Sequence, residues 1–92
     1  MAVIMIAEVP GADASFVDGL VAAGVPDAMV NAPGFVSHIS GITRSGFRVI
    51  EVWESRDAHR AWVDEHITPN VPPGMRPIST EYIELRLEVP KR

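Results

Sequence analysis

Residues 33–69, PGFVSHISGITRSGFRVIEVWESRDAHRAWVDEHITP, decide the fold, because they join a β-hairpin to an amphipathic helix. Two runs rich in β-branched and aromatic residues, about 35–43 and 47–54, flank a turn at 44–46. This pattern predicts two antiparallel strands. The same stretch holds all three histidines and both tryptophans. We therefore expect the chemistry of this chain to lie here or opposite to it.

The hairpin leads into a helix that begins at Ser55 or Asp57 and stops before Pro69. At about 100° per residue, its apolar residues fall on one face. That face consists of a ridge formed by Ala58, Trp62 and His66, with His59, Val63 and Ile67 beside it. We expect His66 close to Trp62, where a buried imidazole needs a hydrogen-bond partner. His59 lies nearer the edge of the stripe, and we expect it to be structural.

The hairpin strands carry polar residues on faces that would otherwise be apolar. Strict alternation puts Val36, His38 and Ser40 on one face of the first strand, and Phe35, Ser37 and Ile39 on the other. One of these faces is therefore expected to line a cavity or a subunit interface. In the second strand one face carries Phe47, Val49, Glu51 and Trp53. His38 then lies near Arg48 or near Glu51, depending on a register that the sequence does not decide.

The rest of the chain supplies two more strands and another helix. Residues 2–9 predict a strand whose two faces are both apolar, so we expect it to be central and covered on both sides. Asp13 is a candidate N-cap for a helix that ends at Gly24, and a short second segment runs to Asn31. Alternating apolar and charged residues predict a last strand at about 80–89, with one buried face.

The resulting order, β-α-β-β-α-β, is typical of a ferredoxin-like α+β fold. A length of 92 residues predicts one domain, 1–92. A chain of this size buries only about 60–65% of its unfolded surface, so a single core leaves it marginally stable. The chain has no cysteine, which excludes disulfides and thiolate metal sites. Homo-oligomerisation is the expected reinforcement.

Charge and hydropathy exclude several classes of partner. The net charge is −4 and the two signs are mixed, whereas nucleic-acid binders usually present a basic face. The apolar start, residues 1–7, is too short to span a membrane and lacks the basic flank of a signal peptide. We expect a soluble cytoplasmic protein that binds neither nucleic acid nor membrane.

The segments PGFVSH (33–38) and RVIEVWES (48–55), followed by a helix with alanine and tryptophan, resemble the antibiotic biosynthesis monooxygenase family. That family belongs to the dimeric α+β barrel superfamily, and the resemblance covers nearly the whole chain. It implies a homodimer in which helices cover one face of each sheet and the partner's sheet covers the other. It also implies a ligand pocket between each subunit's helices and its own sheet.

Members of this family include cofactor-free oxygenases of aromatic polyketides, heme-degrading enzymes and cyclases. The oxygenase type implies a substrate that is an electron-rich phenol or hydroquinone. Once a base removes the phenolic proton, the substrate itself reduces dioxygen, so no metal or flavin cofactor is needed. An unperturbed imidazole, with a pKa of about 6.5, suits that step, and the candidates are His38 and His66. The candidate apolar walls for an aromatic substrate are Met5, Phe16, Trp53 and Trp62.

The heme-degrading branch makes a more specific demand on the sequence. The resemblance places its helix tryptophan at Trp62, but Met5 stands where that branch has an asparagine and Val71 where it has an iron-ligating histidine. Binding of heme or another hydrophobic ligand is therefore the second hypothesis. A related cyclase or a non-catalytic dimer with structural histidines is the third.

The spacing of the histidines does not favour a metal site. His59 and His66 are seven residues apart, which corresponds to about 10 Å along a helix axis. One ion cannot be bound by both. The chain also shows no glycine-rich phosphate loop and no nucleophile elbow. We expect no metal site.

Overall fold

A four-stranded antiparallel sheet in the order β2-β3-β1-β4 forms the centre of the structure. The structure is a computed structural model that describes residues 1–90, apart from the side chains of residues 79 and 80. Its strands are β1 (Val3–Pro10), β2 (Phe35–Thr43), β3 (Gly46–Trp53) and β4 (Ile78–Glu84). Its helical segments are α1 (Ala14–Ala22), α2 (Val25–Val30), α3 (Arg56–Trp62), the π-helix η1 (Val63–Ile67) and the 3₁₀ turn η2 (Pro73–Met75). The predicted ferredoxin-like α+β fold is confirmed.

Side-chain caps start the two main helices where the sequence predicts them. The Asp13 carboxylate accepts the backbone N–H groups of Ser15 and Phe16, at 3.0 and 3.3 Å, and so begins α1. The Ser55 hydroxyl accepts the backbone N–H of Ala58 at 3.1 Å and begins α3. Gly24, with φ +81°, provides the left-handed residue between α1 and α2. Of the two main helices, α3 buries His59 and Trp62, whereas α1 has no fully buried residue and contacts the core through its partly buried Phe16, Val17 and Leu20.

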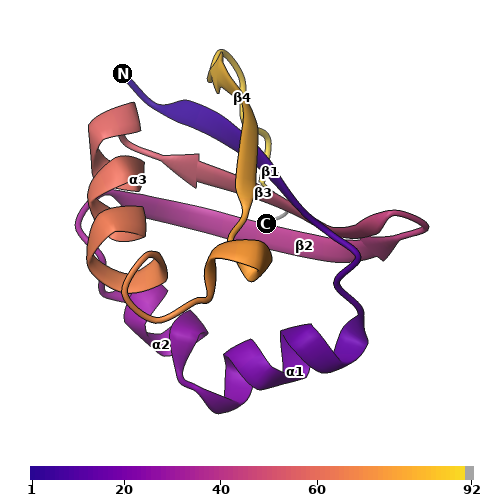
Figure 1. Cartoon of the computed structure of the whole chain (residues 1–92). Coiled ribbons are helices and arrows are strands. Elements are labelled where there is room, and N and C mark those ends of the chain that lie inside the picture. The colour runs from indigo at the N-terminus through magenta and orange to yellow at the C-terminus, as the bar shows by residue number, and fades with distance from the viewer. Residues whose placement is uncertain (91–92) are drawn as a thin grey trace.

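The helices pack on one face of the sheet: α1 and α2 run below β2 in the view of Figure 1, and α3 lies beside β3. Alternate residues of β1 and β3 are buried on this face, which matches the period of two of a strand. The core therefore lies between the sheet and the helices. Its buried apolar residues include Met5, Val9, Phe47, Val49, Trp53, Trp62 and Ile67.

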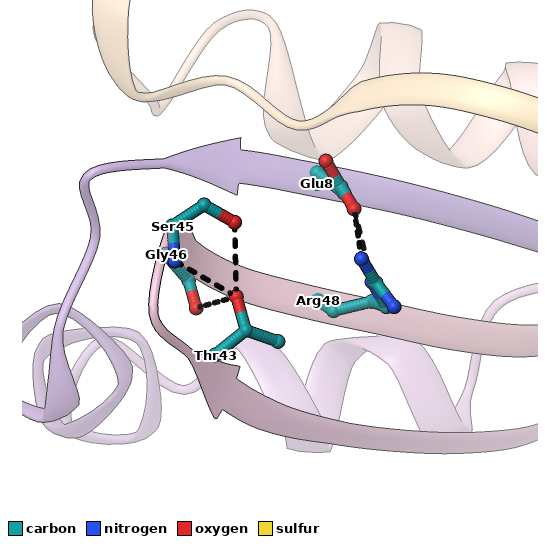
Figure 2. Close-up of polar contacts among 5 residues, drawn as sticks. All are labelled: Glu8, Thr43, Ser45, Gly46 and Arg48. Atoms are coloured by element: carbon teal, nitrogen blue, oxygen red, sulfur yellow. Dashed lines mark hydrogen bonds and ion pairs between the residues drawn. The ribbon is translucent and has the colours of Figure 1, made fainter.

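The β2–β3 hairpin turns at Arg44 and Ser45, so Gly46 already belongs to β3. Thr43 closes the turn, because its hydroxyl donates to the Gly46 carbonyl at 3.1 Å and accepts the Ser45 N–H at 3.3 Å (Figure 2). A Cβ at position 46 would collide with the backbone of Val9 and Gly11. Glycine is therefore required at the point where the hairpin meets the end of β1.

A β-bulge at Val36 interrupts the strict alternation predicted for β2, so that prediction is wrong at the start of the strand. Phe35 pairs with Trp53 but Ser37 pairs with Val52, so one extra residue lies on β2. Beyond the bulge, His38 pairs with Glu51. Phe35 therefore faces the helices together with His38, where strict alternation puts them on opposite faces.

Two further expectations differ from the structure. The last strand ends at Glu84 and not near residue 89, because β1 has run out: Leu85 still donates to the Ala2 carbonyl at 3.0 Å, and Leu87 and Val89 are exposed. β1 is central, as predicted, but within the described residues 1–90 the helices cover only one of its faces. Ile4 and Ile6 on the other face are only partly buried.

Candidate active site

A cavity of about 700 Å³ lies between the inner face of the sheet and the helices. Its volume falls in the usual range for sites that bind small molecules. Most of its lining is apolar, and the sheet, α1, α2, α3 and η1 all contribute. The apolar lining includes Met5, Phe16, Leu20, Met29, Phe47, Val49, Trp62 and Ile67. The polar lining residues are Ser37, His38, Ser40, Glu51, His59 and Arg76. A small hydrophobic molecule with a few polar groups is the ligand that such a lining suits.

The structure brings four of the six sequence-predicted site residues to this cavity: His38, Met5, Phe16 and Trp62. Trp53 is fully buried and lies outside the lining. Its ring packs against those of Phe35, His59 and Trp62, with centroids 5.4, 5.6 and 6.2 Å away. Trp53 therefore packs against the cavity-lining residue Trp62 without lining the cavity itself.

His66, the other predicted catalytic histidine, lies beside Trp62 as the helical spacing predicts. The two rings are stacked, with centroids 4.6 Å apart and planes 25° apart. His66 is partly exposed and does not line the cavity. The π-helical turn there, with Thr68 N–H donating to the Val63 carbonyl at 2.8 Å, continues the helix past Trp62.

Glu51 organises the polar end of the cavity. It projects from β3 among apolar neighbours and is 4% exposed. Its Oε2 accepts a hydrogen bond from His38 Nδ1 at 2.7 Å, and its Oε1 accepts the Trp53 indole N–H at 2.8 Å. Because a carboxylate can only accept, His38 carries its proton on Nδ1. The buried carboxylate therefore fixes both the orientation and the tautomer of the imidazole.

With Nδ1 protonated, the lone pair of a neutral His38 lies on Nε2. That atom is 3.0 Å from the Ser40 hydroxyl, which donates to it. The His38 side chain is 29% exposed, so the basic nitrogen can be reached from the cavity. An imidazole arranged in this way can take a proton from a bound molecule that displaces the Ser40 hydroxyl.

His59 is the second imidazole beside Glu51, with its Nε2 4.0 Å from Glu51 Oε1. Its Nδ1 is 2.7 Å from the Tyr82 hydroxyl. Burial lowers the pKa of His59 below its usual 6.5, an effect that Glu51 opposes and Arg60 reinforces. A neutral His59 therefore directs its Nε2 proton toward Glu51 and accepts the Tyr82 hydroxyl proton at Nδ1.

Four members of this network were absent from the predicted site: Ser40, Glu51, His59 and Tyr82. A signal for Glu51 was present, because a carboxylate at an inward position of β3 requires a partner. His59 was expected near the edge of the helix face but is 4% exposed. The contact between His59 and Tyr82 joins segments 23 residues apart, so no local pattern could reveal it.

Comparisons with known proteins support the fold. No family model matches the sequence, and no curated protein matches it significantly. Among solved structures, the chain is similar to the heme-degrading protein Rv3592 from Mycobacterium tuberculosis, in a heme-free form with cleaved protein. The TM-score is 0.58 at 23% identity, over 98% of this chain and 100% of that one. The likeness shows a shared fold.

The described part of the chain shows neither a cluster of metal ligands nor a membrane-spanning helix. Residues 1–90 contain no group of three or more His, Asp or Glu side chains that could hold a metal ion. None of the helices described in the structure has the length and hydropathy needed to cross a membrane.

Proposed function

We propose that this protein is a cofactor-independent monooxygenase that binds a small aromatic molecule in the cavity and uses His38 as its general base. The observation that carries the proposal is the His38 imidazole, oriented by the buried Glu51 carboxylate at the wall of an apolar cavity of about 700 Å³. An apolar site of this size suits a flat phenolic substrate. Trp62, Phe16 and Met5 supply its walls.

The reaction needs no reductant other than the substrate. His38 Nε2 takes the phenolic proton, and the resulting phenolate is electron-rich enough to reduce dioxygen. At a ring methylene, one oxygen atom is retained as a carbonyl and the other leaves as water with the two methylene hydrogens. The chain itself binds the ring, excludes water and holds the base. Proton transfer to a positioned base typically raises the reaction rate by about 10²–10⁴-fold.

The test is dioxygen uptake with a phenolic anthrone or a hydroquinone, without added metal or flavin and with a chelator present. We expect uptake that depends on the protein and falls by about 100-fold in His38→Ala. His66→Ala is the matched control, because His66 lies outside the cavity lining and its loss should leave the rate nearly unchanged. Uptake no faster than in protein-free buffer would contradict the proposal.

Binding of heme or another hydrophobic ligand is a second candidate, favoured by the similar heme-degrading protein and by the apolar lining. The two imidazoles that line the cavity fit iron ligation poorly. Both ring nitrogens of His38 are engaged by Glu51 and Ser40, and those of His59 face Tyr82 and Glu51. Titration with hemin decides between the candidates: a saturable Soret band favours the heme binder, and its absence together with dioxygen uptake favours the oxygenase.

The proposal includes a homodimer in a cytoplasmic setting. The helix-free face of the sheet supports the dimer, because it presents exposed isoleucines from three strands, Ile39, Ile50 and Ile83. The lack of cysteine fits a reducing compartment. A non-catalytic dimer would show neither dioxygen uptake nor a Soret band and would tolerate His38→Ala apart from some loss of stability.

A further inference from the structure

Ser40, His38 and Glu51 form a chain of hydrogen bonds at the rim of the cavity. Ser40 Oγ is 3.0 Å from His38 Nε2, and His38 Nδ1 is 2.7 Å from Glu51 Oε2. Both imidazole nitrogens are therefore engaged, one by a hydroxyl and the other by a carboxylate. All three residues line the cavity, and Ser40 is also exposed to solvent.

The arrangement follows from the strand geometry. Ser40 and His38 are two residues apart on β2 beyond the bulge, so their side chains leave the same face. The register pairs His38 directly with Glu51 of β3, which brings the carboxylate against the imidazole. The Trp53 indole N–H, at 2.8 Å from Oε1, holds the carboxylate from its other side. Backbone pairing thus sets the positions of the three groups; Glu51 is buried, His38 is partly exposed and Ser40 is exposed.

A hydroxyl hydrogen-bonded to an imidazole, which a buried carboxylate orients in turn, is the arrangement by which proteins activate a serine nucleophile. We propose that Ser40 acts as a nucleophile toward aryl esters, with His38 as its base and Glu51 as the positioning residue. This goes beyond the proposed oxygenation, since it forms a covalent acyl-serine and consumes no dioxygen. The two activities share His38 and can fail separately.

The proposed step is a hydrolysis in two halves. Ser40 Oγ attacks the ester carbonyl while its proton passes to His38 Nε2, and the bond to the phenolic oxygen breaks. The phenolate takes the proton from His38 and leaves as a phenol. A water molecule then attacks the acyl-serine while His38 takes its proton, and His38 returns that proton to Ser40 Oγ as the acyl–oxygen bond breaks, which releases the carboxylic acid and free Ser40. Ester and water thus give acid and phenol, with no oxidant or reductant.

The surroundings indicate the class of ester. The apolar cavity next to Ser40 receives an aromatic ring in preference to a charged group. A phenolate leaves more easily than an alkoxide, so aryl esters need less assistance from the acid form of His38. Small acyl groups on a phenolic ring are therefore the expected substrates, and peptides and alkyl esters are not.

The first test is covalent labelling of the full chain with a fluorophosphonate, followed by peptide mass mapping. We expect one adduct, on Ser40, and a burst of p-nitrophenol from p-nitrophenyl acetate. Ser40→Ala should abolish both, and His38→Ala and Glu51→Gln should slow labelling by about 100-fold. Ser45→Ala is the matched control: Ser45 is exposed on the same hairpin but its hydroxyl contacts Thr43 (Figure 2), so this change should have no effect.

The second test replaces the nucleophile and does not depend on ester turnover. Because the chain has no cysteine, Ser40→Cys and Ser45→Cys each introduce a unique thiol. Beside the His38 imidazole, the thiol of Ser40→Cys should ionise at lower pH and react with iodoacetamide about tenfold faster at pH 7 than that of Ser45→Cys. Adding His38→Ala should remove the difference.

The outcomes separate the two proposals. Ester cleavage that survives Ser40→Ala, or equal thiol reactivity at positions 40 and 45, overturns the serine nucleophile while leaving the oxygenation to its own assay. Labelling of Ser40 without dioxygen uptake overturns the oxygenation alone. Circular dichroism of each variant shows whether a loss of labelling reflects unfolding, in which case the thiol comparison decides.

Discussion

Glu51 is a buried carboxylate without a lysine or arginine partner in the described contacts; His38 and Trp53 supply its hydrogen bonds. We predict that Glu51→Gln lowers the free energy of unfolding by roughly 1–3 kcal/mol, because the charge-assisted bond to the imidazole is lost. Urea denaturation measures this. Glu8→Gln is the control, since the Glu8–Arg48 pair is 2.7 Å long but partly exposed to solvent on both sides (Figure 2). It should cost less than about 1 kcal/mol. Equal losses in both variants would contradict the structural importance of Glu51.

His59 should make the protein sensitive to mild acid. Burial lowers the pKa of folded His59 below 6.5, so the unfolded chain binds the proton more readily between the two values. Stability is therefore complete above about pH 6.5 and falls as the pH drops toward the folded pKa. NMR titration should give a midpoint for His59 below 6.5, and His59→Asn should flatten the dependence of unfolding free energy on pH. A midpoint at or above 6.5 would contradict the effect of burial.

At the scale of single residues, the sequence predicts which types of side chain form the site better than it predicts their partners. His38, Met5, Phe16 and Trp62 could be placed at the cavity because each lies on the inward side of its element. The Glu51 contact could not be fixed, since it depends on the hairpin register. Tyr82 could not be found at all, because its bond to His59 arises only when β4 packs beside α3.

At the scale of elements, the helices and the hairpin follow from local signals, namely the caps at Asp13 and Ser55, the left-handed Gly24 and the hairpin turn. The bulge at Val36 and the early end of β4 do not. Both are consequences of pairing between strands: a bulge changes the face of every residue before it, and a strand ends where its neighbour ends. The alternation of apolar and charged residues in 85–89 indicates that this segment could extend the strand if a neighbouring strand were there to pair with it.

The junction between β2 and α3 offers a test of element packing. Gly34 has φ +84°, and a Cβ there would lie 2.5 Å from the Ala58 Cβ. We predict that Gly34→Ala costs roughly 1 kcal/mol of backbone strain and 1–3 kcal/mol more from the overlap. Gly11→Ala is the matched control, since Gly11 has φ +77° with nothing within 4 Å of its Cβ position. Thermal unfolding should show a larger loss of stability for Gly34→Ala than for Gly11→Ala. Equal losses would contradict this prediction and would mean that α3 shifts to make room for the added methyl group.

At the scale of the whole molecule, residues 1–90 cover only one side of the sheet with helices. The helices and the cavity lie on that side, while the other side carries Ile4, Ile6, Ile39, Ile50 and Ile83. A chain of 92 residues has little core to spare, so burial of this second face would stabilise it substantially. The two apolar faces of residues 2–9 predict a strand covered on both sides, whereas residues 1–90 cover only the face toward the helices.

We therefore predict that the protein is a homodimer whose sheets meet on their helix-free faces. Sedimentation equilibrium should give twice the chain mass of 10.0 kDa. Ile50→Lys, at the middle of that face, should shift the equilibrium to monomer, because an unpaired charge cannot be buried there without a large cost. Val30→Lys is the control: Val30 is 69% exposed on α2, against 37% for Ile50, and lies on the helical side. A monomeric wild type, or dissociation caused equally by both variants, would contradict the pairing, since only position 50 faces the proposed partner.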